Sequence, residues 1–350
     1  MTLFLSLSFR RSIAFNKVFY TNELNKKGLP FNLKENLLIL PKINFCFALV
    51  LSFGGNFNSA TIEGIKLWAS CVLPALFPYF FITAVLSSLK VTSGFANLLS
   101  PFTKKIFNTG GASGFAFFMS LLSGYPIGAK VVSDLRKNGF LSSVESVRAS
   151  AFCSTSSPMF LIGSVGTLMF NDKLFGVKLL LVHILSSIIV GFIFSFYKRS
   201  QKPVFKTSFA LNNGLDNILY ESVYSSVISI LVVGGLITLF YLLTHILLFF
   251  NLLDPVINLL TFFVKDKTVA KSLALGFFEC TQGLKVLSTA NVSSLSLPIA
   301  CFICGFGGLS VIAQSVAYLK SAKIKVAPFI FAKLLGATVN FILGLIFCLV

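Results

Sequence analysis

Four short strings of small and polar residues interrupt the apolar segments of this chain, and they carry the side chains best suited to bind a polar solute. They are residues 124–130 (GYPIGAK), 154–158 (STSSP), 279–283 (ECTQG) and 305–310 (GFGGLS). Glycine permits tight turns, and proline ends one helix and begins the next. Amides freed at the start of a half-helix favour an anion or a polar group, whereas carbonyls freed at its end favour a cation. We therefore expect these strings to bind a small polar or ionic solute.

The predicted solute-binding residues are the glycines, hydroxyls, amides and charges of these strings, extended to one glutamine on the next apolar helix. They are Gly124, Tyr125, Pro126, Gly128, Lys130, Ser154, Thr155, Ser156, Glu279, Thr281, Gln282, Gly283, Gly307, Gly308, Ser310 and Gln314. Gln314 is equally suited to a hydrogen bond between two helices. Lys130 and its repeat counterpart Lys285 could bind an anion, but extension toward the membrane interface is the favoured interpretation.

Glu279 follows the apolar string SLALGFF and is therefore expected at membrane depth. Acidic residues inside a membrane are costly and usually functional. We predict that Glu279 contacts an ion, a proton or the solute. The alternative is a structural ion pair with Lys130 or Lys285.

The composition identifies the class of protein. The chain has 350 residues, of which 55% are hydrophobic and 11% charged, and its mean hydropathy is +0.88. Soluble domains carry about 25% charged residues. Residues 67–89 and 222–253 contain no Asp, Glu, Lys or Arg, and a membrane span needs about 20 apolar residues. The chain is thus predicted to be an integral membrane protein whose partner is the lipid bilayer.

The net charge of +18 does not indicate nucleic-acid binding in such a protein. Lys and Arg gather in the N-terminal stretch and in residues 197–206 (YKRSQKPVFK), where they orient the chain by the positive-inside rule. We place both segments in the cytoplasm and predict no nucleic-acid partner.

Nothing in the sequence favours catalysis or a cofactor. HExxH, GxSxG and P-loop motifs are absent, and no paired-carboxylate motif occurs. Cys301 and Cys304 have CxxC spacing without a second pair or a nearby histidine, and His183 and His245 each stand alone in apolar spans. We therefore predict a protein that is not an enzyme, with no cofactor and no metal site; an enzyme that acts on lipid is the less favoured alternative.

The two interrupted regions resemble each other. NLLSP at residues 97–101 matches NLLDP at 251–255 in four of five positions, and GAKVVS at 128–133 matches GLKVLS at 283–288 in four of six. Further on, residues 152–166 align with residues 303–317 in the same order. Internal repeats with broken helices are typical of transporter folds, in which the site lies between the repeats near the membrane midplane.

We therefore predict an all-α, polytopic integral membrane protein made of two homologous repeats with interrupted and re-entrant helices. The repeats are expected to be inverted, with about eight to ten membrane elements in total. The predicted regions are a cytoplasmic N-terminal extension (1–42), a membrane region with the first repeat (43–197), a polar linker (198–217) and a membrane region with the second repeat (218–350). The charged stretch at residues 134–148 is expected to be a solvated or interfacial connection.

The interrupting strings and the segment LWASCVLPALFPYFFITAVL resemble sporulation integral membrane proteins of the YlbJ type, within the wider nucleoside-recognition or gate domain group. The resemblance covers about residues 60–345. It implies a multi-pass protein of the bacterial inner membrane, needed in sporulating cells and related to nucleoside transporters. Ser154 and Thr155 stand where family members often have Asn and Thr, so the solute preference inferred from the family is least secure there.

The resemblance and the repeats together predict a transporter or gate for a small polar or ionic solute, with nucleosides as one candidate class. The alternative is a non-transporting membrane scaffold for assembly of the spore cortex or coat. Candidate protein partners are a second copy of the chain and proteins of the spore envelope.

Overall fold

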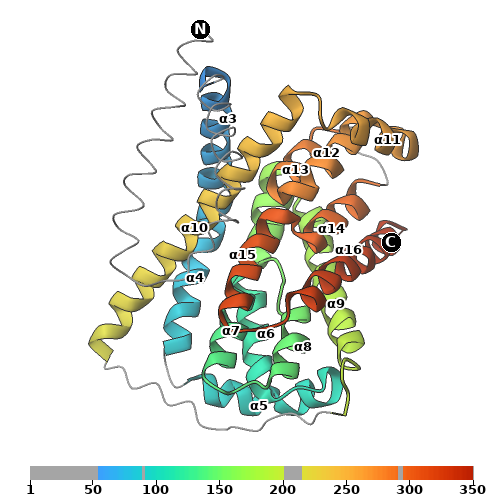
Figure 1. Cartoon of the computed structure of the whole chain (residues 1–350). Helices are drawn as coiled ribbons and strands as arrows, with labels where there is room; N and C mark the ends of the chain where they lie inside the picture. The colour runs from blue at the N-terminus through green and yellow to red at the C-terminus, as the bar shows by residue number, and fades with distance from the viewer. Residues whose placement is uncertain (1–53, 89–90, 201–214, 291–294, 350) are drawn as a thin grey trace, which may run out of the picture. The chain divides into compact units, whose positions relative to one another are not determined.

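The computed structural model describes residues 54–88, 91–200, 215–290 and 295–349 (Figure 1). The predicted N-terminal extension and most of the predicted linker lie outside these ranges. Residues from Asn56 onward form one compact unit. Every regular element in the described residues is helical, as the all-α prediction required.

The first half begins with a long helix in three consecutive parts, namely α3 (Gly54–Leu67), the π-helical turn η1 (Trp68–Val72) and α4 (Leu73–Ser88). It continues with α5 (Val91–Phe107), α6 (Gly111–Ser123), α7 (Ile127–Lys137), α8 (Ser143–Phe152), the π-helix η2 (Met159–Met169) and α9 (Lys173–Phe194).

The second half has the same order of elements. A long helix, α10 (Leu215–Phe249), is followed by α11 (Asp254–Val264), α12 (Lys267–Phe278), α13 (Cys280–Leu287), α14 (Ser296–Phe306), α15 (Gly308–Ser321) and α16 (Val326–Leu349). The aligned sequence strings fall on matching elements, with GAKVVS in α7 and GLKVLS in α13. The repeat read from the sequence is therefore a repeat of structure.

Equivalent helices of the two halves run in opposite directions. The α3–α4 helix packs along α10 with Phe57 against Phe249 at one end and the Trp68 ring against Gly234 further along, so residue numbers rise on one helix as they fall on the other (Figure 1). Likewise, α9 packs along α16 with Lys178 bonded to Phe347 and Phe194 against Phe331. This antiparallel arrangement is that of inverted repeats.

Among the residues that the structure describes, five helical segments are long and apolar enough to cross a membrane: Phe57–Ser87, Lys173–Phe194, Asn217–Phe249, Ser296–Ser321 and Val326–Leu349. The shorter helices Gly111–Ser123, Met159–Met169 and Asp254–Val264 are also apolar. Large side chains such as Leu231 and Phe331 are exposed on the long helices. Because water would not solvate such a surface, these faces are suited to lipid.

Glycines with positive φ make the sharpest breaks. Gly124 ends α6 at φ 79°, and Gly307 ends α14 at φ 79°, followed by Gly308 at φ 78°. A side chain is strained in this region, so glycine is the natural residue at all three positions. Pro126 precedes α7 and Glu279 precedes α13, so each half contains a tight hairpin of two short helices.

The charged stretch at residues 134–148 is not wholly solvated, which corrects the prediction. Glu145 and Arg148 are 1% and 0% exposed. The Glu145 carboxylate accepts hydrogen bonds from the Gly110 and Ser142 amides, and Arg148 donates to the carbonyls of Tyr197 and Lys198. These two side chains therefore form hydrogen bonds with backbone groups that the helix ends leave without partners. The bonds offset the cost of burying the two charges.

Gly128 and Gly283 were predicted at the turns, but each lies in the first turns of the helix that follows. A Cβ at Gly128 would be 1.7 Å from the Cys153 carbonyl oxygen, and one at Gly283 would be 2.4 Å from the Gly276 Cα. Each glycine thus allows a backbone-to-backbone contact beside a break.

We predict that Gly128→Ala and Gly283→Ala each lower the free energy of unfolding by about 1–3 kcal/mol or more, because rigid backbone must move to admit the methyl group. The measurement is the yield of monodisperse protein in detergent and its Tm. Gly235→Ala is the matched control, since no atom lies within 4 Å of its Cβ position. Wild-type yield and Tm for both site variants would show that the contacts are not tight.

Candidate functional site

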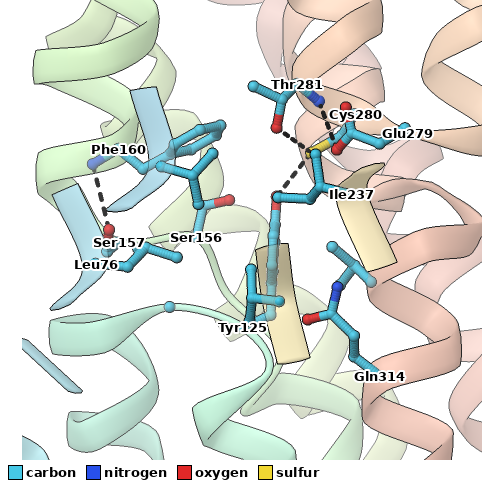
Figure 2. A pocket seen from close by; sticks show the side chains of 14 residues that line it. Leu76, Tyr125, Ser156, Ser157, Phe160, Ile237, Glu279, Cys280, Thr281 and Gln314 are labelled. Carbon is cyan, nitrogen blue, oxygen red and sulfur yellow. Dashed lines mark hydrogen bonds between the residues drawn. The ribbon is translucent and has the colours of Figure 1, made fainter. Parts of the chain in front are cut away.

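A cavity of about 30 Å³ lies where the breaks of the two halves meet. Tyr125 and Ser156 face it from the two breaks of the first half, and Glu279 and Thr281 from the α12–α13 break of the second (Figure 2). Gln314 lines it from α15. The walls are completed by apolar side chains of α4 and α10, including Leu76 and Ile237. The cavity thus joins residues from both halves of the chain.

Two buried polar oxygens at this cavity lack a hydrogen bond of good geometry, although Ser156 Oγ is near the Tyr125 hydroxyl. Ser156 and Gln314 are 2% and 3% exposed, and neither Ser156 Oγ nor Gln314 Oε1 has a hydrogen bond of good geometry within the described part of the chain. Figure 2 shows the two side chains on opposite sides of Tyr125, with their oxygens turned toward it. Buried polar atoms without protein partners are rare, and they usually bind water, an ion or a ligand. This pair is the most direct sign of a binding site.

Glu279 is buried, as predicted, but it is not paired with a lysine. Its two carboxylate oxygens accept hydrogen bonds from the Thr281 and Gln282 amides at 3.1 and 2.6 Å, so it is the N-cap of α13. The Lys130 ammonium instead donates to Ser225 Oγ at 2.7 Å, and Lys285 is exposed. The alternative of a structural ion pair is therefore wrong. The carboxylate also fills the place where the α13 amides could have bound an anion.

Tyr125 connects the first half to the second across the cavity. Its hydroxyl lies 3.6 Å from Cys280 Sγ, and Cys280 follows directly after Glu279 (Figure 2). The Tyr125 ring is 8% exposed and forms one wall. An aromatic side chain of this size in so small a space sets the width of the cavity.

The other predicted residues support the breaks and do not line this cavity. Pro126, Gly128, Gly283, Gly307 and Gly308 shape the backbone, as described above. Thr155 Oγ1 lies 2.7 Å from Ser120 Oγ, Gln282 Oε1 accepts from Thr244 Oγ1 at 2.7 Å, and Ser310 Oγ accepts from Gln314 Nε2 at 3.4 Å. The Ser154 carbonyl accepts from Lys333, which is considered below.

Lys130 lies in a second and larger cavity of about 270 Å³ between α4, α7 and α10. The lining contains one ammonium and two carboxylates, from Lys130, Asp134 and Glu221. The rest of the lining consists of hydroxyl groups, from Thr83, Ser87, Ser222, Ser225, Ser226 and Ser229, and of the apolar residues Phe80, Ala84, Ile127 and Val131. Lys130 therefore faces an internal cavity with a mixed polar and apolar lining, in contrast to the predicted extension toward the membrane interface.

Two residues at the site were not predicted to take part in it. His183 Nε2 accepts a hydrogen bond from the Ser156 amide at 2.9 Å, so this histidine holds the break at residues 153–158 in place. Lys333 is 3% exposed, and its ammonium contacts the same break. The signal for Lys333 was available, because it is the one charge in residues 326–350, and a lone charge in a span is usually functional.

The fold is that of a solved membrane transporter. A concentrative nucleoside transporter, CNTnw, in an inward-facing substrate-bound state aligns with a TM-score of 0.55 at 15% identity, covering 92% of this chain and 86% of that chain. A variant of CNTnw in an intermediate state aligns with a TM-score of 0.54 at 14% identity, covering 88% and 86%. At such low identity the likeness establishes the fold alone.

One curated relative defines the family, although no family model matches the chain. The sporulation integral membrane protein YlbJ of Bacillus subtilis (strain 168) is 32% identical over 325 residues, which cover 86% of this chain and 80% of that protein. This agrees with the multi-pass membrane architecture described above. The chain belongs to the YlbJ family of sporulation integral membrane proteins.

Proposed function

We propose that this protein is a transporter or gate that moves a small polar or ionic solute across the membrane of a sporulating cell. The observation that carries the proposal is the small cavity lined by Ser156 and Gln314, whose unpartnered oxygens come from opposite halves of an inverted repeat. Polar atoms buried at membrane depth are costly, so a function that uses them is the simplest account of their presence.

The size of the cavity bears on the solute. A volume of about 30 Å³ admits one or two waters or a small ion, because one water needs about 10–15 Å³ on this measure. Drug-sized ligands occupy pockets of about 300 Å³ or more. A nucleoside-like solute would therefore require Tyr125 and the breaks around it to move apart. The conformation described here has room only for a solute of that small size.

The second cavity supplies a route to the first. Both lie between α4 and α10, where Leu76 and Val233 line the small cavity and Phe80 and Ser229 line the large one. These pairs are separated by four residues, or about one turn of helix. A polar solute in the large cavity is thus about one helical turn from the site.

The large cavity is assigned to the cytoplasmic side. Lysines and arginines gather at the same end of the helices, in the last turns of α5, α7 and α15 and in the connections after α9 and α15: Lys104, Lys105, Arg136, Lys137, Lys198, Arg199, Lys320, Lys323 and Lys325. The bonds from Arg148, in the middle of α8, to the carbonyls of Tyr197 and Lys198 tie the residues that follow α9 to α8 there. An excess of basic residues marks cytoplasmic loops.

Ser156→Ala and Gln314→Leu are predicted to reduce heat-resistant spore counts at least ten-fold in a deletion strain of the host, with normal membrane levels of the protein. Each removes an unpartnered oxygen, and Gln314→Leu also removes the long 3.4 Å bond from Nε2 to Ser310 Oγ, so folding should lose little while solute binding is lost. Ser187→Ala is the control, because that hydroxyl bonds only within its own helix, to the Ile184 carbonyl. If both site variants restore sporulation fully and a variant lacking residues 202–212 does not, the scaffold alternative is favoured.

The two roles of the Glu279 side chain, as the N-cap of α13 and as a buried carboxylate charge, can be tested separately. Glu279→Ser retains an acceptor for the α13 amides, since serine is a good N-cap, but removes the carboxylate. We expect this variant to reach wild-type protein levels and to fail in sporulation, whereas Glu279→Asp, which caps and keeps the charge, should retain part of the function. Full activity of Glu279→Ser would assign the residue to helix capping only.

Ser225→Cys is predicted to react with a membrane-impermeant methanethiosulfonate reagent from the cytoplasmic side, because position 225 lines the large polar cavity. Val232→Cys on the same helix is the control. Val232 is 46% exposed on the apolar surface, where lipid keeps a thiol un-ionised and unreactive. Labelling is compared with the parent protein in inside-out and right-side-out vesicles. Equal labelling of the two variants, or labelling of Ser225→Cys only from outside, would contradict the assigned route.

A further inference from the structure

Lys333 carries a buried positive charge without a carboxylate partner. It lies on α16, an unbroken span, and is 3% exposed. Lys333 forms no ion pair with any residue in the described ranges. The salt bridge found in those ranges joins two exposed residues, Lys66 and Glu63. Glu279 is not its counter-ion, since that carboxylate is bonded to the amides of α13. A lone ammonium at membrane depth needs another source of stabilisation.

Backbone at the ends of two broken helices supplies it. The Lys333 ammonium donates to the Ser154 carbonyl at 3.4 Å, and Ser154 lies one residue beyond the C-cap of α8. A Cβ on Gly307, the C-cap of α14, would lie 3.5 Å from the same Nζ atom. The C-terminal end of a helix carries a partial negative charge. Because α8 and α14 are equivalent in the two halves, Lys333 lies where two such ends converge.

A third break contributes an aromatic face. The Lys333 Nζ atom lies 5.2 Å from the centroid of the Tyr125 ring, within the range of a cation–π interaction. His183 is nearby but accepts the Ser156 amide through Nε2, so that nitrogen carries no proton. The surroundings of the ammonium therefore include a carbonyl oxygen, helix C-termini and a π face, all of which favour a cation, and the thiols of Cys280 and Cys304 lie nearby.

Such surroundings are those in which a broken-helix membrane protein holds a monovalent metal ion. We infer that the Lys333 ammonium is a resident cation that takes the place of a bound Na⁺ at the convergence of α8 and α14. The charge site can be tested apart from transport. Its consequence, that solute movement needs no Na⁺, rests on the proposed function.

The test is the Tm of the full-length protein, purified in detergent, in sodium chloride and in choline chloride at equal ionic strength. Wild type is expected to have the same Tm in both salts. Lys333→Ala, which leaves the carbonyls and room for an ion, is expected to melt lower in choline. Na⁺ should then raise its Tm by about 2–4 °C for each ten-fold excess over the dissociation constant. Lys178→Ala is the matched control, because Lys178 is also a lysine in a span bonded to a backbone carbonyl.

Three results would overturn the inference. They are an equal Tm of folded Lys333→Ala in both salts, a Na⁺-dependent Tm of the wild type, and the same Na⁺ response in Lys178→Ala. Lys333→Ser, which offers a hydroxyl ligand, is purified in parallel. If either Lys333 variant folds only when Na⁺ is present during purification, the inference is supported. If neither folds with Na⁺ present, the site does not accept the ion and the inference fails.

Discussion

Each backbone group freed at a helix break must find a partner inside the protein, because the lipid core supplies none. In the described residues, the few buried charged side chains bond to these freed backbone groups, and the sign of each charge is opposite to the partial charge of the helix end that it contacts. The acids lie at helix starts, with Glu145 at α6 and α8 and Glu279 at α13. The bases lie at helix ends, with Arg148 at α9 and Lys333 at α8. The breaks, and therefore the cavity that they surround, depend on these pairings.

This constraint explains which parts of the structure were predictable from the sequence. Repeats and breaks are local signals, since GYPIGAK, STSSP, ECTQG and GFGGLS each interrupt an apolar run. All four breaks were found where these strings predicted them. The duplicated order of elements predicted the repeat, whereas the inverted orientation is shown by the antiparallel packing of α3–α4 on α10 and of α9 on α16. Gly124, Tyr125, Ser156, Glu279, Thr281 and Gln314 were correctly placed near one another for the same reason.

What could not be read from the sequence is the partner that each polar group takes across the fold. Glu145 and Arg148 lie in a charged string that is typical of a solvated loop, and their burial depends on helix ends that converge only in three dimensions. The bond between Lys130 and Ser225 joins residues 95 positions apart. Lys333 is a different case, because a lone charge in an apolar span can be recognised in the sequence. Its contacts with two breaks of the first half, however, depend on how α16 packs and could not be inferred from the sequence.

The two halves share a fold but not a chemistry, and this difference gives the site its character. The last helix of each half places one basic side chain at a break: His183 contacts Ser156 from α9, and Lys333 approaches Gly307 from α16. Ser156 and Gly307 occupy aligned positions in the repeat. One half therefore presents a hydroxyl and an imidazole, and the other a bare backbone and an ammonium. Similarly, Glu279 aligns with Gly124 and adds a carboxylate to one half only.

A strictly symmetric site would offer a solute the same groups from both sides and so could not fix its orientation. Here the cation from α16 and the carboxylate cap of α13 belong to the second half, whereas the unpartnered Ser156 hydroxyl belongs to the first. Because these two charges are already bonded at helix ends, they contribute to the electrostatic field of the site, and the groups left to hydrogen-bond the proposed solute are neutral oxygens. We expect a site of this kind to select by hydrogen bonding and size within a field that the protein itself supplies.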